Sequence, residues 1–157
     1  RVLFRSTITK IRPLHRNDYH NEYLPLLQQE FMIDSSQITF EQFARFVDDT
    51  KKQTFVLEQR TNRVPETNIQ IIGSVTIIIE EKLIHNMGKV CHIEDVVIDK
   101  KSRGKGYGKK LVQYCVNLAT TIGCYKCILN CSEENVKFYE KCGTGFHSKG
   151  VEMAAYL

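Results

Sequence analysis

The chain has 157 residues, of which 42% are hydrophobic and 25% charged, values that are ordinary for a soluble globular protein. This length suits one domain, and we expect residues 1–157 to form a single one. The net charge is +4, but no long run of lysines and arginines indicates nucleic acid, and no apolar run approaches the roughly 20 residues that cross a membrane. No secretory signal is recognisable, so we expect an intracellular protein, in the cytoplasm or in an organelle.

The first half of the chain predicts a strand, two helices and a hairpin of two strands. The first strand covers 7–14. A helix follows from Asn17-Asp18, with Pro25 marking a late start or a kink, and Thr39 caps a second helix.

The predicted hairpin consists of a short strand, a polar loop and a long strand. The strands cover 54–57 and 69–80, and the loop covers 59–68. Gly73 lies inside the alternating pattern of the long strand, which is typical of a β-bulge.

The second half of the chain alternates strands with helices. Strands are predicted over 90–99, 126–131 and 151–157, and helices begin near Tyr107 and Ser132. An antiparallel first half followed by a β-α-β-α-β second half predicts an α/β fold with a mixed (α+β) central sheet flanked by helices.

Six cysteines raise the question of disulfides or a metal. A disulfide framework is not expected in an intracellular chain. Cys124 and Cys127 have the C-x-x-C spacing of zinc and redox motifs, but a second pair of this spacing is missing. Cys127 and Cys131 alternate with Leu129 as one face of a strand does. We therefore predict reduced, partly buried thiols and no bound metal.

The segment Arg103–Gly108 reads R-G-K-G-Y-G and lies between a predicted strand and a predicted helix. Glycine allows positive φ and close approach of a ligand to the backbone, and the helix adds unpaired N–H groups and the positive end of its dipole. One interpretation is a phosphate or pyrophosphate site, and the other is a tight turn with solvated cations. The spacing fits neither the G-x-G-x-x-G dinucleotide motif nor a Walker loop.

Two further groups of polar residues carry possible chemistry. Glu94 and Asp95 interrupt an apolar strand, where adjacent residues face opposite sides, so at most one of them points into a given pocket. Asn135 and Tyr139 lie one turn apart on a predicted helix, and a tyrosine can donate a proton to a leaving group. The alternative interpretations are that Glu94 and Asp95 form surface ion pairs and that Tyr139 is an ordinary core residue. His85 and His92 are weaker acid–base candidates.

The R-x-x-G-x-G pattern of Arg103, Gly106 and Gly108 resembles the acetyl-CoA loop of the GNAT acetyltransferase superfamily, and the element order fits the GNAT fold. Within that superfamily the chain resembles the family that acetylates the amine of glucosamine 6-phosphate. The matching segments are E-K-L-I-H at 81–85, H-I-E-D-V-V at 92–97, G-C-Y-K at 123–126, N-V-K-F-Y-E-K-C-G at 135–143 and G-V-E-M at 150–153. The match is looser before residue 70, where T-F-E-Q-F at 39–43 is the best anchor.

The resemblance implies that acetyl-CoA is the cosubstrate and that its binding residues are those of the loop and of the strand before it. The backbone amides of Arg103, Gly104, Lys105, Gly106, Tyr107 and Gly108 would hold its pyrophosphate. Its pantetheine arm would pair with Val96, Val97 and Ile98, where a backbone N–H would polarise the thioester carbonyl. Asn135 would contact the cosubstrate as well.

The resemblance also implies the catalytic and substrate residues. Tyr139 would stabilise or protonate the departing thiolate, while the sugar phosphate would be held by Lys82, Leu83, Ile84, His85 and Glu94, in a pocket shaped by Asp95. The amine would attack the thioester directly in a ternary complex. The resemblance also implies a homodimer, in which the C-terminal strand with Glu152 is expected to reach the partner subunit.

Four features depart from the family pattern. Asn130 stands where the family has an acidic residue. An amide can accept a hydrogen bond from the amine but cannot take its proton, so Asn130 is a candidate for binding the amine and Glu94 or a water is a candidate for the base. The turn at 142–146 is longer, no basic residue follows Met153, and the threonine expected near 32–34 is not evident. A GNAT enzyme for another amine, or a catalytically weak acyl-CoA-binding module, therefore remains open.

Overall fold

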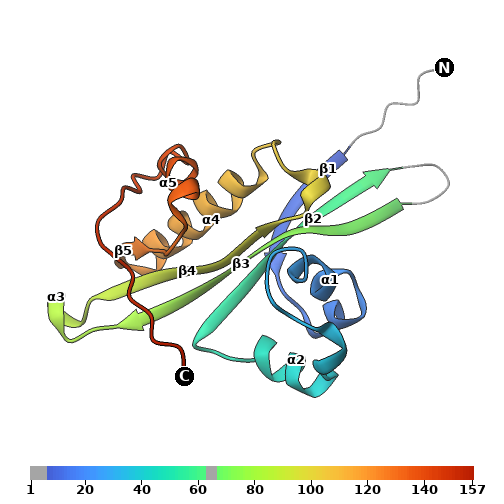
Figure 1. Cartoon of the computed structure of the whole chain (residues 1–157), viewed down its shortest axis with the longest axis horizontal. Helices are drawn as coiled ribbons and strands as arrows, with labels where there is room; N and C mark the ends of the chain where they lie inside the picture. Colours follow the sequence, from blue (N-terminus) through green and yellow to red (C-terminus); the bar gives the residue numbers. More distant parts are fainter. Residues whose placement is uncertain (1–6, 63–66) are drawn as a thin grey trace.

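The computed structural model describes residues 7–62 and 67–157 (Figure 1). Its five strands form one sheet in the order β1-β2-β3-β4-β5. Antiparallel pairing joins β1 to β2, β2 to β3 and β3 to β4, whereas β5 is parallel to β4. The bounds are Thr7–Pro13 (β1), Lys52–Asn62 (β2), Thr67–Glu81 (β3), Lys89–Ile98 (β4) and Cys124–Ile128 (β5). The mixed sheet confirms the predicted fold class.

The central hairpin is longer than predicted. β2 extends well beyond 54–57, and most of the polar segment 59–68 belongs to β2 and β3, although its residues 63–66 lie outside the described part of the chain. Polar residues remain in the ladder because β2 is paired on both sides, and backbone hydrogen bonds need no apolar side chain. A register shift leaves Ile72 without a β2 counterpart, so the bulge predicted at Gly73 lies beside it.

One helix covers one face of the sheet. α4 (Tyr107–Ile122) crosses over β4 and connects it to β5, and Gly123 ends the helix at a φ of 87°. Its buried residues Leu111, Cys115 and Ala119 pack on β3 and β4 in the larger of two hydrophobic clusters. The β-α-β connection between parallel strands places the N-terminus of α4 after the end of β4.

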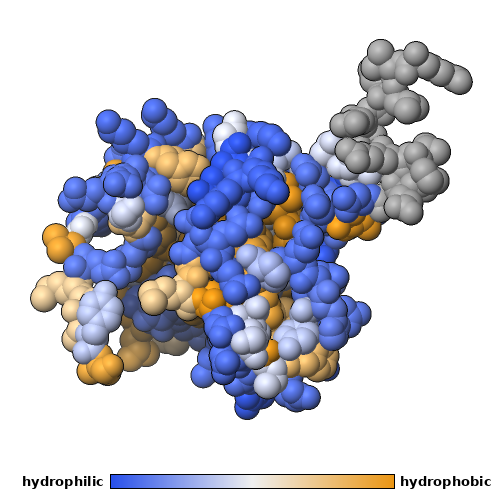
Figure 2. Space-filling view, turned by 45° about the vertical axis from the view of Figure 1, so that its right-hand side comes forward, coloured by the Kyte–Doolittle hydropathy of each residue, from blue (hydrophilic) through white to orange (hydrophobic). Residues whose placement is uncertain are grey.

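The other face is covered by short helices from the N-terminal half. The helix predicted from Asn17 is divided into a 3-10 turn, η1 (Arg16–His20), and α1 (Tyr23–Leu27). α2 (Phe40–Val47) follows a second turn, η2 (Ser35–Gln37), and begins at the predicted cap, where Thr39 Oγ1 accepts a hydrogen bond from Gln42 N at 3.2 Å. None of the helices in the described part of the chain is long and apolar enough to cross a membrane. The face in Figure 2 is mostly hydrophilic, with separate hydrophobic patches.

The prediction of a last strand is wrong. α5 (Glu133–Glu140) is the last regular element, and residues 151–157 form no strand and are exposed. A strand requires a partner backbone, and among the described residues the tail pairs with none. The outer edge of β5 is likewise without a paired strand in the described part of the sheet.

Candidate active site

The glycine loop lies between β4 and α4, after a 3-10 turn, η3 (Lys100–Ser102). Gly104 and Gly106 have φ values of 76° and 80°, which L side chains rarely adopt. Gly106 is also the N-cap of the 16-residue helix α4, so the free N–H groups of the first helical turn lie next to the loop. An exposed backbone at the positive end of a helix dipole is an arrangement that can bind an anion.

Arg103 is paired within the protein. Its guanidinium contacts Glu30 at 2.5 Å and donates to the carbonyl of Ile98 at 3.0 Å. No ion pair of the described residues includes Lys105. The positive charge that faces a ligand on this loop therefore comes mainly from Lys105 and the helix terminus.

β4 and β5 pair over only part of their length. The parallel register runs from Lys89 with Cys124 to His92 with Ile128. Beyond His92, the segment 93–98 of β4 has no partner on β5. Its backbone edge, which includes Val96, Val97 and Ile98, is open to an extended ligand that pairs like an added strand. This open edge leads toward the glycine loop.

A bulge distorts β4 at the centre of this open edge. Glu94 pairs with Thr76 and Val97 with Ser74, so Asp95 and Val96 together lie opposite a single β3 residue. Asp95 has a φ of 51°, which costs about 1–3 kcal/mol for a non-glycine residue. A bulge leaves one residue out of the ladder, and its N–H can polarise a carbonyl at the open edge. The expected strict alternation of Glu94 and Asp95 is therefore broken.

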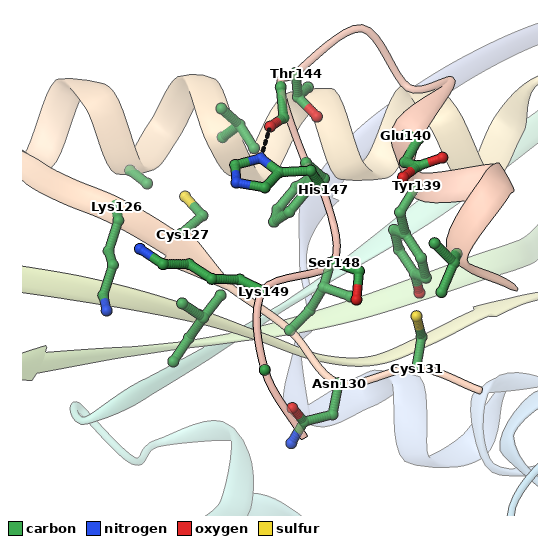
Figure 3. A pocket seen from close by; sticks show the side chains of 18 of the residues that line it. Lys126, Cys127, Asn130, Cys131, Tyr139, Glu140, Thr144, His147, Ser148 and Lys149 are labelled. Carbon is green, nitrogen blue, oxygen red and sulfur yellow. Dashed lines mark hydrogen bonds between the residues drawn. The ribbon is translucent and has the colours of Figure 1, made fainter. Parts of the chain in front are cut away.

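Tyr139 and Asn130 border a common cavity of about 630 Å³ between β5, α4, α5 and the segment 144–152 (Figure 3). Tyr139 comes from α5 and Asn130 from the chain just after β5. The hydroxyl of Tyr139 and the thiol of Cys131 point toward one another in Figure 3. Burial raises the pKa of Tyr139 to about 12, so its phenol is a neutral donor near pH 7.

Glu94 lies elsewhere, on the sheet face opposite α4. The residues Thr76 and His92 share that face, because Thr76 is its register partner and His92 is two residues away. His92 Nε2 is 2.8 Å from Glu80 Oε2, and Lys82 Nζ is 2.6 Å from Glu80 Oε1. Lys82 is thus connected through Glu80 to the strand that carries Glu94. Sequence reasoning did not identify Glu80, whose position in an ordinary surface pattern gave no signal.

The rest of the expected substrate segment lies at the turn between β3 and β4. This turn is α3 (Ile84–Met87), where His85 and Asn86 have left-handed φ values of 55° and 56°. The His85 ring packs on Tyr125, with centroids 4.2 Å apart. Leu83 and Ile84 are exposed. The structure therefore separates His85 from Glu94 by the first half of β4.

The last expected cosubstrate residue, Asn135, is exposed in the first turn of α5, and its N–H binds the carbonyl of Ser132. Cys91 and Cys127 are register partners on β4 and β5, and hydrogen bonding to Cys127 together with burial raises the pKa of Cys91. Within residues 7–62 and 67–157, no group of three or more His, Cys, Asp or Glu side chains has an arrangement that could hold a metal ion.

A mixed sheet that opens between β4 and β5 below a glycine loop defines an acyltransferase of the acetyltransferase (GNAT) family. The chain belongs to this family, whose profile matches residues 12–144. It is 38% identical to glucosamine 6-phosphate N-acetyltransferase 1 of Dictyostelium discoideum, over 93% of this chain and 89% of that protein. It is 37% identical to glucosamine 6-phosphate N-acetyltransferase of Arabidopsis thaliana, over 94% and 96% of the two chains.

Solved structures agree with this assignment. The crystal structure of the Arabidopsis thaliana glucosamine-6-phosphate N-acetyltransferase superimposes with a TM-score of 0.81 at 35% identity, covering 95% of this chain and 98% of that one. An aminoglycoside N-acetyltransferase solved in complex with CoA has the same fold, with a TM-score of 0.69 at 14% identity over 99% and 100% of the two chains.

Proposed function

We propose that this chain transfers the acetyl group of acetyl-CoA to the amine of glucosamine 6-phosphate, giving N-acetylglucosamine 6-phosphate and CoA. The observation that carries the proposal is the match over nearly the whole chain to curated relatives of that name. The open edge of β4 and the glycine loop provide a place for the cosubstrate that is consistent with this activity.

Acetyl-CoA fits the site in two parts. The amides from Arg103 to Gly108 bind the pyrophosphate, with Lys105 supplying charge. The pantetheine arm lies along Val96, Val97 and Ile98, and the N–H freed by the bulge polarises the thioester carbonyl. Asn135, on the neighbouring helix α5, contacts the cosubstrate from the other side of the opening.

The reaction is a direct attack of the amine on the thioester, without an acyl-enzyme. Holding both reactants on one edge of the sheet supplies much of the rate. The neutral phenol of Tyr139 protonates or stabilises the departing thiolate. Asn130 borders the same cavity and accepts a hydrogen bond from the amine, whereas Glu94 or a water bound to it takes the proton.

The sugar phosphate lies on the face that carries Glu94, with Asp95 at its border. Lys82 faces the same region through its contact with Glu80 and adds positive charge for the phosphate. Leu83, Ile84 and His85 lie too far along the hairpin to join this pocket within one chain. They complete the pocket of a partner subunit, together with the tail that contains Glu152.

A homodimer is consistent with two unpaired features of the single chain. β5 has an outer edge without a paired strand in the described sheet, and the tail beyond Gly150 is exposed and rich in apolar residues. An added strand from a second copy would satisfy the free backbone groups of that edge. We expect the tail of each subunit to pair at the edge of the other.

Thiol release from acetyl-CoA tests the proposed function. The acceptors to compare are glucosamine 6-phosphate, unphosphorylated glucosamine and a panel of other amines. Release with glucosamine 6-phosphate at a kcat/KM well above that of glucosamine is the expected result. Ready acetylation of another amine, with no release from glucosamine 6-phosphate at high enzyme concentration, would overturn it.

Asn130 favours a second candidate, because the missing acid removes a base from the site. In this candidate the protein is a GNAT enzyme for another amine, or a module that binds acetyl-CoA without turnover. The amine panel detects the first. Calorimetry detects the second, as tight binding of acetyl-CoA by a protein that releases no thiol with any acceptor.

A further inference from the structure

The turn after α1 binds the beginning of the glycine loop through the side chains of Gln29 and Glu30. Gln29 Nε2 donates to Asp99 Oδ1 at 2.9 Å, and Gln29 Oε1 accepts from the backbone N–H of Lys100, also at 2.9 Å. The next residue, Glu30, binds Arg103. These contacts join parts of the chain about 70 residues apart, and we call Gln29 and Glu30 the clasp.

The clasp holds the first half of the loop at both of its ends. Asp99 is fixed on each side, because Gln29 occupies Oδ1 and Ser102 donates to Oδ2 at 3.1 Å. Its backbone N–H binds Ile72 on β3 at 2.9 Å. At the other end, Arg103 is held between Glu30 and the carbonyl of Ile98. The positions of Gly104 and the residues after it follow from this anchoring.

The charges of the clasp also matter for an anionic ligand. Although burial acts against it, hydrogen bonding from Gln29 and Ser102 keeps the pKa of Asp99 below its usual value, so Asp99 is a carboxylate at neutral pH. A free carboxylate at the start of the loop would repel a pyrophosphate. The hydrogen bonds from Gln29 and Ser102 occupy both carboxylate oxygens and keep the carboxylate turned toward α1 and η3.

We propose that Gln29 is a positioning residue for the pyrophosphate of the cosubstrate: it preorganises the Asp99–Gly108 loop from the outside and contacts neither reactant. This inference rests on the proposed use of acetyl-CoA and extends it to a residue outside the glycine loop. Binding energy is gained when a loop is already ordered before its ligand arrives.

The test compares two thioesters, because S-acetylpantetheine lacks the pyrophosphate and the nucleotide. In Gln29→Ala, KM for acetyl-CoA should rise about tenfold, as expected for two lost hydrogen bonds. For S-acetylpantetheine, kcat/KM should stay within about twofold of the wild-type value. Gln28→Ala is the matched control, since Gln28 bonds the exposed Ser35 hydroxyl instead and should leave both thioesters unaffected.

Two further variants should raise KM for acetyl-CoA to different extents. Gln29→Glu keeps the acceptor for Lys100 N but places a carboxylate against Asp99, so it should raise KM for acetyl-CoA at least as much as Gln29→Ala. Glu30→Gln alters a contact that is partly exposed and should have a smaller effect. Equal losses for both thioesters would show a merely structural role and overturn the inference, as would an unchanged KM for acetyl-CoA in Gln29→Ala.

Calorimetry with CoA and with pantetheine separates this inference from the proposed acceptor. If wild-type protein binds CoA but does not acetylate glucosamine 6-phosphate, the proposed function fails, while selective weakening of CoA binding in Gln29→Ala still supports the positioning role. If wild-type protein does not bind CoA, both fail. Poor folding of Gln29→Ala would appear as a lowered Tm, in which case Gln29→Glu, which has the same shape, decides the question.

Discussion

Gly108, the last residue of the glycine loop, lies directly against Phe138, the residue before Tyr139. A Cβ on Gly108 would come within 2.9 Å of Phe138 Cζ. The ring of Phe138 in turn meets that of Tyr139 edge-on, with centroids 4.9 Å apart. The loop that is proposed to bind the pyrophosphate is therefore in direct packing contact with the helix that carries the proposed acid.

Gly108→Ala tests this contact. Alanine favours the helix by about 1 kcal/mol, and Phe138 is 38% exposed and can move, so we expect little change in Tm. The displaced ring should shift Tyr139 and lower kcat/KM for acetyl-CoA several-fold. Gly150→Ala is the control, since no atom lies within 4 Å of a Cβ there. Full activity in Gly108→Ala would show that Phe138 moves without disturbing Tyr139.

Tyr139→Phe should lower kcat more than it raises KM for acetyl-CoA, because the proposed role of the hydroxyl is at the leaving thiolate. Tyr114→Phe is the control, a tyrosine whose ring packs on Phe55 at 5.0 Å, away from the site. Burial raises the pKa of Tyr139 to about 12. At pH values below about 10, ionisation of Tyr139 should therefore not reduce kcat. A fall in kcat near pH 8 that disappears in Tyr139→Phe would contradict this assignment.

Asn130→Asp should leave turnover unchanged or raise it. Asn130 borders the cavity that Tyr139 lines, so a carboxylate there restores a proton acceptor close to the amine. Asn117→Asp, an exposed position on α4, controls for the added charge. Steady-state kinetics with glucosamine 6-phosphate decide the matter. A large loss of activity would mean that the site has been rebuilt around the amide.

Deleting residues 151–157 should leave the fold intact, because this tail is exposed and pairs with no described strand. If the tail completes a partner's site, the deletion should also shift the protein from dimer to monomer in sedimentation and reduce kcat/KM strongly. A dimer of undiminished activity after deletion would remove the tail from both roles.

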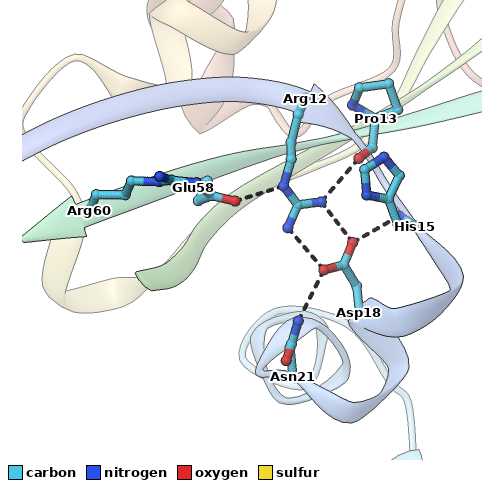
Figure 4. A network of polar contacts seen from close by, with 7 residues as sticks. All are labelled: Arg12, Pro13, His15, Asp18, Asn21, Glu58 and Arg60. Atoms are coloured by element: carbon cyan, nitrogen blue, oxygen red, sulfur yellow. Dashed lines mark hydrogen bonds and ion pairs between the residues drawn. The ribbon is translucent and has the colours of Figure 1, made fainter. Parts of the chain in front are cut away.

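Arg12 links β1 to the helical layer and to β2 (Figure 4). It contacts Asp18 at 2.8 Å and Glu58 at 2.7 Å, and these carboxylate side chains are only 4% and 7% exposed. Removing the guanidinium would leave two buried charges without their main partner. Arg12→Met should therefore lower the free energy of unfolding by about 3 kcal/mol in urea titrations near pH 7.

The pH dependence of that loss has a definite sign. For Asp18, burial opposes ionisation, but hydrogen bonds from Arg12, the His15 N–H and Asn21, together with the charge of Arg12, outweigh it. For Glu58 the hydrogen bond with Arg12 is the leading cause, so both carboxylate pKa values lie below normal. This stabilisation is present above about pH 4 and is lost as the pH falls through the lowered pKa values. The stability gap between wild type and Arg12→Met should shrink from pH 6 to pH 3.

Arg16→Met is the matched control, because its ion pair with Asp48 is exposed to solvent. Its effect on stability should be much smaller than that of Arg12→Met. A gap between wild type and Arg12→Met that stays constant with pH would show that packing of the arginine side chain, rather than its charge, stabilises this part of the fold.

Local patterns in the sequence determined several elements of this protein. The alternation of apolar residues predicted β3 and β4, helical spacing predicted α4, and Thr39 predicted the start of α2, because these signals depend on neighbours within a few residues. The R-x-x-G-x-G spacing predicted a glycine loop between a strand and a helix, and in this loop Gly104 and Gly106 adopt left-handed conformations. These features need no knowledge of what lies elsewhere in the chain.

Only the tertiary structure determined where β4 and β5 separate and which residues anchor the glycine loop. The bulge at Asp95 follows from the pairing of β4 with β3, and the open edge from the short reach of β5, neither of which is encoded by a local pattern. The hydrogen bond from Gln29 of the clasp to Asp99 joins residues 70 positions apart. The tail at 151–157 has strand-like residues but no strand in a single chain, because pairing depends on a second backbone.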